Sequence, residues 1–198
     1  MRKKILTLCV LLSTAFGVNA QNTAKESYRN FTVYRTTKGN AENIAKMKTL
    51  LQQQDQLSPK QVTNLQYHLG RMYEEIGDPE NALFYYEQSL KGEANYTVSR
   101  RALGFIYLSK TKPFVKQMNE ASAAKDAIAN ANAFSKYKDM VLKALPHLEK
   151  YQACEPDEET LNMITNLYKS IKDQQSIASL PDRLKMMEGT CVTLLDDE

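Results

Sequence analysis

Apolar positions along this chain recur mostly every three or four residues, the spacing of an amphipathic helix. The clearest helix begins at Ser58-Pro59, a capping residue followed by proline, and ends at Gly77. A second helix begins at once at Asp78-Pro79 and can end at Gly92. No segment combines strict alternation with many β-branched residues. We therefore expect an all-α chain in which short turns join antiparallel helices.

The pattern Leu-Gly-x-x-Tyr occurs twice, and all three residues are displaced by the same interval between the two copies. A single helix hairpin leaves an apolar face uncovered, so it needs a neighbour of similar pattern. In the first hairpin we expect Gly70 and Ala82 to meet where the helices cross, with Tyr86 and Leu90 covering the seam to the next unit. The two copies are Leu69, Gly70 and Tyr73, and Leu103, Gly104 and Tyr107.

This pattern resembles the tetratricopeptide repeat (TPR) family. Gln66 and Ser89 depart from the family's aromatic and small positions. The resemblance covers residues 63–96 and implies a short α-solenoid in which the first helix of each unit lines a concave face that binds protein or peptide. The matching residues are Leu69, Gly70, Tyr73, Gly77, Ala82, Tyr86 and Leu90.

A second repeat, predicted over residues 97–156, is interrupted. Lys116 stands where a counterpart of Ala82 is expected, and a suitable stretch with Ala144, Leu148 and Tyr151 follows only after an insertion. For the insertion near residues 113–140 we expect a helix followed by a loose loop; an extension of the preceding helix and an extra hairpin are the alternatives.

The remaining segments match the repeat pattern only in part or not at all. Residues 157–188 read as a degenerate third repeat, with Asp157 as cap and Pro181 interrupting its second helix. Residues 24–57 read as a capping hairpin around Gly39-Asn40, and residues 189–198 as a loose tail. The predicted repeats and their cap together make a single helical domain over residues 21–198.

The N-terminus has the features of a signal peptide. Arg2, Lys3 and Lys4 precede an uncharged apolar run, and the sequence Val18-Asn19-Ala20 predicts cleavage after Ala20. An uncleaved anchor is the alternative. Without residues 1–20, Lys plus Arg falls from 26 to 23 while Asp plus Glu stays at 23, so the net charge falls from +3 to zero. We expect a periplasmic or secreted protein that neither binds nucleic acid nor inserts into a membrane after cleavage.

Two cysteines remain in the predicted mature chain, Cys154 and Cys191. In an oxidising compartment they can form a disulfide that contributes on the order of 3 to 4 kcal/mol. The alternative is a buried Cys154 and a free thiol in the tail. The spacing alone does not decide between them.

The sequence gives no indication of catalysis, a cofactor or a metal. His68 and His147 lie in different predicted units, and neither has partners at metal-ligand spacing. No nucleophile elbow, phosphate-binding loop or Cys-x-x-Cys pair is present. We therefore expect a protein that is not an enzyme.

A candidate binding site comes from the first helix of each of the first two repeats. Side chains facing away from the crossing belong there to Asn64, Tyr67, Arg71, Arg101 and Phe105. The two arginines are able to hold a carboxylate of a peptide, flanked by the two aromatic rings. The alternative is that all five are ordinary solvated or partly packed positions.

The expected function is a non-catalytic scaffold of the bacterial cell envelope that binds a protein or peptide through its concave face. The signal peptide, few repeats and the insertion together resemble small exported repeat proteins of Bacteroidota-type bacteria. The alternative is a self-associating structural or assembly component of an envelope complex.

Overall fold

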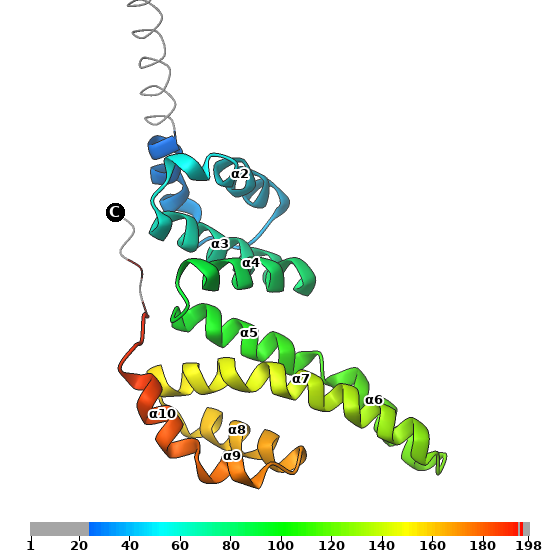
Figure 1. The fold of residues 1–198 in the computed structure, drawn as a ribbon. Coiled ribbons are helices and arrows are strands. Elements are labelled where there is room, and N and C mark those ends of the chain that lie inside the picture. The colour runs from blue at the N-terminus through cyan, green and yellow to red at the C-terminus, as the bar shows by residue number, and fades with distance from the viewer. Residues whose placement is uncertain (1–23, 194, 196–198) are drawn as a thin grey trace, which may run out of the picture. The chain divides into compact units, whose positions relative to one another are not determined.

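The computed structural model describes residues 24–193 and 195, and the described chain is all-α, as predicted (Figure 1). The predicted signal peptide, residues 1–20, lies outside the described residues. The chain forms two compact units, residues up to Gln88 (unit 1) and Ser89–Leu195 (unit 2), and the division falls within one helix. None of the described helices is long and apolar enough to cross a bilayer.

Unit 1 begins with the predicted hairpin around Gly39-Asn40. A helix over residues 24–34 is followed by α2 (Ala41–Leu51), which Asn40 caps by accepting from the backbone N–H of Asn43. The short 3-10 helix η1 (Gln54–Gln56) leads to α3 (Pro59–Glu75) and then α4 (Pro79–Gly92). The buried core of unit 1 includes Phe31, Met47, Leu50, Leu65, Leu69, Met72, Tyr73, Ala82 and Tyr86.

The start of α3 shows why the sequence fixes this helix well. Ser58 accepts from the N–H of Gln61, and the Gln61 side chain accepts from the N–H of Ser58, which completes a capping box. Pro59 occupies the first turn, where its missing N–H costs nothing. The chain leaves the helical conformation after Glu75, and Gly77 in the following turn has a φ of 78°, which favours glycine.

Unit 2 contains the end of α4 and six further helices. A buried cluster in its core is built from α7, α8 and the helices that follow, and includes Val141, Ala144, Leu145, Leu148, Ile164, Leu167, Tyr168, Ile171 and Leu180. Pro181 lies in the first turn of the last helix, directly after a short one, as predicted. The helices are α5 (Thr97–Ser109), α6 (Lys112–Ala123), α7 (Ala127–Cys154), α8 (Glu158–Ser170), α9 (Gln174–Ala178) and α10 (Leu180–Glu188).

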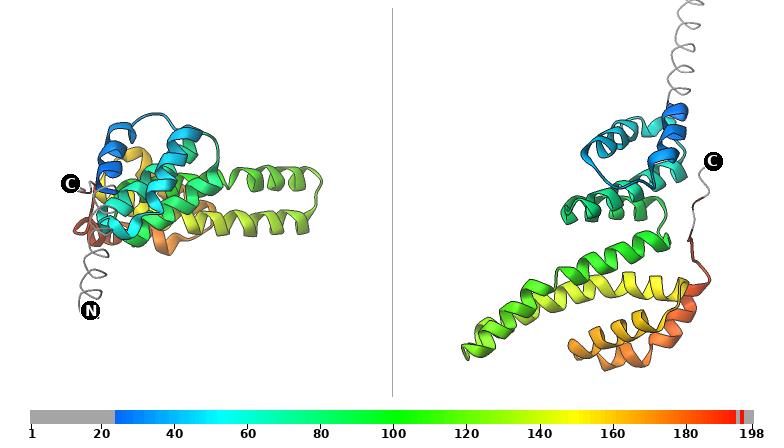
Figure 2. Two further views of the ribbon diagram at one scale, coloured as in Figure 1. Left: turned by 90° about the horizontal axis from the view of Figure 1, so that it is seen from above. Right: turned by 180° about the vertical axis from the view of Figure 1, so that it is seen from behind.

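The insertion forms a helical hairpin, so the expected loose loop is wrong. The hairpin, called the arm below, consists of α6 and residues 127–140 of α7, which run side by side (Figure 2). The small side chains of Ala121 and Ala133 are buried in it. The Asn130 amide donates to the carbonyl of Met118 at 3.0 Å and to Ser122 Oγ at 2.8 Å. A composition rich in Ala and Asn thus permits close helix packing here.

The two glycines of the repeated pattern make the same kind of contact. A Cβ on Gly70 would lie 2.7 Å from the ring of Tyr86, and a Cβ on Gly104 would lie 2.7 Å from Leu148 Cδ2. Leu148 stands where a counterpart of Tyr86 is expected in the second repeat once the insertion is allowed for. Tyr86 therefore fills the crossing itself, where Ala82 was expected.

Three helix-to-helix turns share one construction. The residue at positive φ is Gly77, Lys125 or Lys172, with φ of 78°, 55° and 61°. The next residue is an aspartate in each case, and its side chain accepts from backbone N–H groups of the following helix. Its own N–H donates to a carbonyl of the preceding helix, at 2.9 to 3.0 Å. Such turns join helices as short antiparallel pairs.

The segment predicted as a loose tail is attached over its first residues. Cys191 forms a disulfide with Cys154, with their Cα atoms 5.5 Å apart. Val192 forms an isolated parallel bridge with Tyr96, in which the N–H of Thr97 donates to Val192 O at 2.8 Å. This bond satisfies a backbone donor at the start of α5, where no side chain caps the helix. Residues 194 and 196–198 lie outside the described part.

Candidate functional site

The predicted residues of unit 1 lie on α3, and their side chains are largely engaged within the unit. Asn64 is 4% exposed. Tyr67 packs against His68 and Tyr86, with ring centroids 4.9 and 5.9 Å apart. Arg71 donates from Nη2 to the carbonyls of Arg35 (2.6 Å) and Thr37 (2.8 Å), and it pairs with Glu75 from Nη1.

These bonds give Arg71 a role in the fold. Glu75 also accepts from the N–H of Gly39, so Arg71 and Glu75 together hold residues 35–39 against α3. Gly39 packs directly against the backbone of α3. A Cβ at this position would lie 2.5 Å from Met72 O, so only glycine fits there without a shift. Whether Arg71 also binds a partner stays a prediction.

In unit 2, the structure brings Arg101 and Phe105 together on α5. The Arg101 guanidinium lies 5.2 Å from the centroid of the Phe105 ring and 5.6 Å from that of Tyr151. Phe105 is half-buried and packs against the core of unit 2. Arg101 itself is exposed. Its charge also helps to lower the pKa of Asp157, after the larger effect of the hydrogen bonds from Thr160.

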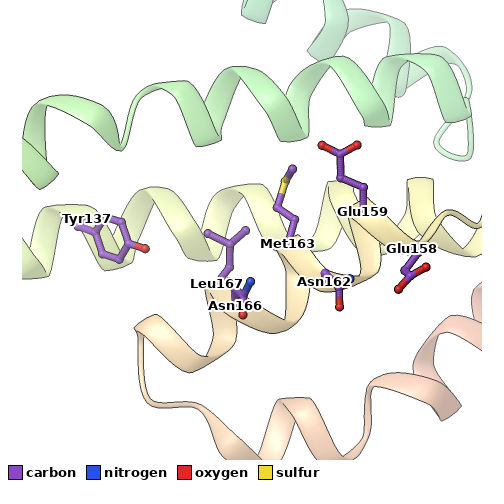
Figure 3. A pocket seen from close by; sticks show the side chains of 7 residues that line it. All are labelled: Tyr137, Glu158, Glu159, Asn162, Met163, Asn166 and Leu167. Atoms are coloured by element: carbon purple, nitrogen blue, oxygen red, sulfur yellow. The ribbon is translucent and has the colours of Figure 1, made fainter.

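A hollow that the sequence did not indicate lies along α8 (Figure 3). It has a volume of about 790 Å³ and is called the α8 hollow below. Its lining contains two carboxylates, two amides and no cationic side chain. The lining residues are Tyr137 from α7 and Glu158, Glu159, Asn162, Met163, Asn166 and Leu167 from α8.

The α8 hollow uses the helix positions that were proposed for binding in the first repeat. Glu159, Asn162 and Asn166 have the same spacing along α8 as the three predicted residues of the first repeat have along α3. The third predicted repeat has Thr165 and Ile177 in place of the glycine and alanine of the pattern, and the sequence analysis predicted no binding residues there. The spacing of Leu161, Ile164 and Tyr168 was the signal that could have pointed to it.

The helix that carries the hollow is anchored by polar bonds within unit 2. Asp157 caps α8 by accepting from the N–H of Thr160 at 2.8 Å. Tyr168 donates to buried Glu149, which Arg183 also binds through two nitrogens, at 2.6 and 3.0 Å. Burial raises the pKa of Tyr168, and Glu149 raises it further. The hydroxyl therefore stays protonated and keeps this bond at neutral pH.

The arm contributes to the same site. Tyr137 lines the hollow from α7, and its hydroxyl lies 2.7 Å from Ser170 Oγ near the end of α8. The insertion therefore adds an aromatic wall to the third repeat.

The lining of the α8 hollow offers charged, polar and apolar contacts. Carboxylates attract cationic groups, amides both donate and accept, and Met163 and Leu167 provide apolar contact. Among the described residues, no group of three His, Cys, Asp or Glu side chains could hold a metal ion.

Comparison with known proteins gives a local similarity. Over 55 residues, 28% of this chain, the sequence is 44% identical to "Uncharacterized protein ycf37" of Guillardia theta. The similar segment spans 30% of the length of that protein. No protein-family model matches the chain, and no solved structure matches it to a significant level. The similarity is therefore partial and assigns no activity.

Proposed function

We propose that this chain is an exported helical-repeat protein of the TPR type that binds an extended peptide along α8. The observation that carries the proposal is the α8 hollow, which lies at the helix positions where the repeat pattern predicts binding residues. The contacts of Gly70 with Tyr86 and of Gly104 with Leu148 support a repeated hairpin. The all-α fold is compatible with this family.

The lining favours a peptide that is basic or neutral. Glu158 and Glu159 have no cation beside them in the lining, so a Lys or Arg side chain of the peptide would meet opposite charge. Asn162 and Asn166 are both exposed, and their amides fit the backbone groups of an extended segment. The sequence analysis predicted that Arg71 and Arg101 bind a carboxylate of the peptide. Arg71 already donates to backbone carbonyls within unit 1, so the proposed ligand is now a basic or neutral peptide on α8.

Selection from a random peptide library on the immobilised mature protein tests the proposal. We expect enrichment of peptides with Lys or Arg among apolar residues. Asn162→Trp and Asn166→Trp fill the hollow from its lining and should weaken binding of a selected peptide at least tenfold. Gln175→Trp on α9 is the matched control, since it changes an exposed amide outside the hollow.

Two results would count against this proposal. One is equal binding by Asn162→Trp, Asn166→Trp and Gln175→Trp. The other is selection of acidic peptides whose binding is lost in Arg71→Glu with Arg101→Glu, which would return the site to the residues predicted from the sequence.

Export is part of the proposal and is supported by the disulfide, since such bonds persist in oxidising compartments. The mass of the protein purified from its own cells should correspond to a chain that begins at Gln21. Self-association, the alternative function, predicts a mass in light scattering that rises with concentration.

A further inference from the structure

A second hollow of unit 2 is lined by three cationic side chains. They are Arg100 on α5, Lys150 on α7 and Arg183 on α10. The hollow has a volume of about 420 Å³ and is called the α5–α10 pocket below. No carboxylate is among its lining residues, which also include Asn95, Pro146, Met186, Met187 and Thr190.

One of these three charges is neutralised within the protein. Arg183 binds the buried carboxylate of Glu149 with Nε and Nη2. In such a bidentate ion pair, the positive charge of Arg183 is balanced by the negative charge of Glu149. Arg183 therefore forms part of the pocket wall, and Lys150 and Arg100 give the pocket its net positive charge.

Lys150 is a buried ammonium with neutral partners. The residue is 5% exposed. Its Nζ donates to the carbonyl of Met187 at 2.8 Å and to Thr190 Oγ1 at 2.7 Å. An ammonium has three donors, so one remains for a further acceptor. A buried charge without an opposite charge in contact is costly, and an anion in the pocket would remove that cost.

The hydrogen-bond partners of Arg100 among the described residues are also neutral. It donates to the carbonyl of Ala94 from Nε at 3.0 Å and from Nη2 at 2.7 Å, and Nη1 lies 3.2 Å from His147 Nδ1. These bonds use three of its five N–H donors. Burial lowers the pKa of Arg100.

The charged groups around Lys150 leave the pocket positive. Burial and then Arg100 lower the pKa of Lys150, while Glu93 acts in the opposite direction. His147 adds no charge at neutral pH, since burial and Arg100 lower its pKa to about 4. Glu93 lies outside the lining and accepts from the N–H of Asn95.

We propose that the α5–α10 pocket binds a small oxyanion with an apolar substituent, either a short-chain carboxylate or a phosphate monoester. The oxyanion accepts from the remaining donors of Lys150 and Arg100, in a hollow where Arg183 is already paired. Pro146, Met186 and Met187 give the substituent apolar contacts. This site is separate from the α8 hollow, with which it shares no lining residue.

Calorimetric titration of the oxidised mature protein at constant ionic strength tests the inference. The probes are hexanoate, phenyl phosphate and the neutral 1-hexanol. We expect saturable binding of at least one anion and none of the alcohol. Binding of hexanoate alone assigns the pocket to carboxylates, and binding of phenyl phosphate alone assigns it to phosphate monoesters.

Two pairs of variants locate the binding. Met186 is 74% exposed and lines the pocket, so Met186→Glu should fold and should weaken anion binding about tenfold relative to Met186→Gln. Lys150→Met should weaken it about tenfold or more, whereas Lys185→Met, an exposed change on α10, should not.

Three outcomes would overturn the inference. They are no saturable binding of either anion, equal binding of 1-hexanol, and equal anion binding by Met186→Glu and Met186→Gln. The Met186 pair keeps the test decisive if Lys150→Met does not fold.

Discussion

The hairpin of α3 and α4 and the hairpin of α5, α6 and α7 solve the same packing problem with different loops. In the first, the three residues Ile76–Asp78 turn the chain; in the second, the arm intervenes. Yet each glycine faces one large side chain, Tyr86 or Leu148. The helices α3 and α5 also end at equivalent positions of the repeated pattern, since Glu75 and Ser109 each come two residues after its tyrosine.

This difference shows that the crossing, and not the connection, sets the register. The arm adds α6 after the end of α5 and a segment paired with it at the start of α7, so residues on one side of the crossing keep their partners on the other. The insertion can then leave Gly104 opposite Leu148. The arm is thereby free to carry a residue such as Tyr137 to the next helix.

Truncating the two side chains that face the glycines should have the largest effect. Tyr86 is 2% exposed and Leu148 is fully buried. We expect Tyr86→Ala to cost about 4 kcal/mol and Leu148→Ala about 3 kcal/mol of unfolding free energy. The exposed Phe84 and Leu142 on the same helices provide the matched controls, and their alanine variants should cost less than about 1 kcal/mol. Denaturation followed by hydrogen exchange measures each unit, and equal losses in variants and controls would refute a shared crossing.

The two units also differ in covalent cross-linking, because the disulfide joins two residues of unit 2. Removing it with Cys191→Ser should lower the free energy of unfolding of unit 2 by about 3 kcal/mol. The wild type in reductant should behave in the same way. Protection of unit 1 amides should stay unchanged, and an equal loss there would show that the units do not respond separately.

Acid should weaken unit 2 through His147. Its pKa is lowered to about 4 in the folded chain, from an ordinary value near 6.5. The unfolded chain therefore binds the proton first, so stability is lost as the pH falls from about 6.5 through 4, by about 3 kcal/mol. In His147→Asn, which retains an acceptor for Arg100, this decline should be shallower. Identical pH profiles for unfolding would contradict the assignment.

The smallest effects are expected at the turns. Lys125 and Gly77 both have positive φ, but only glycine adopts it without strain. Lys125→Gly should therefore stabilise unit 2 by about 0.5 to 1 kcal/mol, while Gly77→Ala should destabilise unit 1 by about 1 kcal/mol. Thermal melts measure both changes, and a loss of stability in Lys125→Gly would contradict the turn.

The same turns explain what the sequence revealed. Gly77-Asp78 was recognisable because glycine marks a helix end, and Ser58, Asp78 and Asp157 predicted caps that the structure confirms. Lys125-Asp126 has the same geometry without glycine, so a loose loop was predicted where the second helix of the arm begins. Asp126, which can cap a helix, was the residue that indicated a helix start there.

The candidate site was less accessible to sequence reasoning. The repeat pattern pointed to positions on α3 and α5, but no sequence pattern shows that the carbonyls of Arg35 and Thr37 accept hydrogen bonds from Arg71. Those contacts join segments that are far apart along the chain, on either side of α2. The α8 hollow was missed because it requires knowing which side chains remain uncovered after packing.

Removal of the arm tests most directly whether the second hairpin is the first hairpin with an insertion. Residues 113–140 are deleted, and Thr111-Lys112 is replaced by Gly-Asp, as at Gly77-Asp78. If the crossing sets the register, this chain folds cooperatively, and nuclear Overhauser contacts join Gly104 to Leu148. A chain that fails to fold, or that places another residue opposite Gly104, would contradict the account.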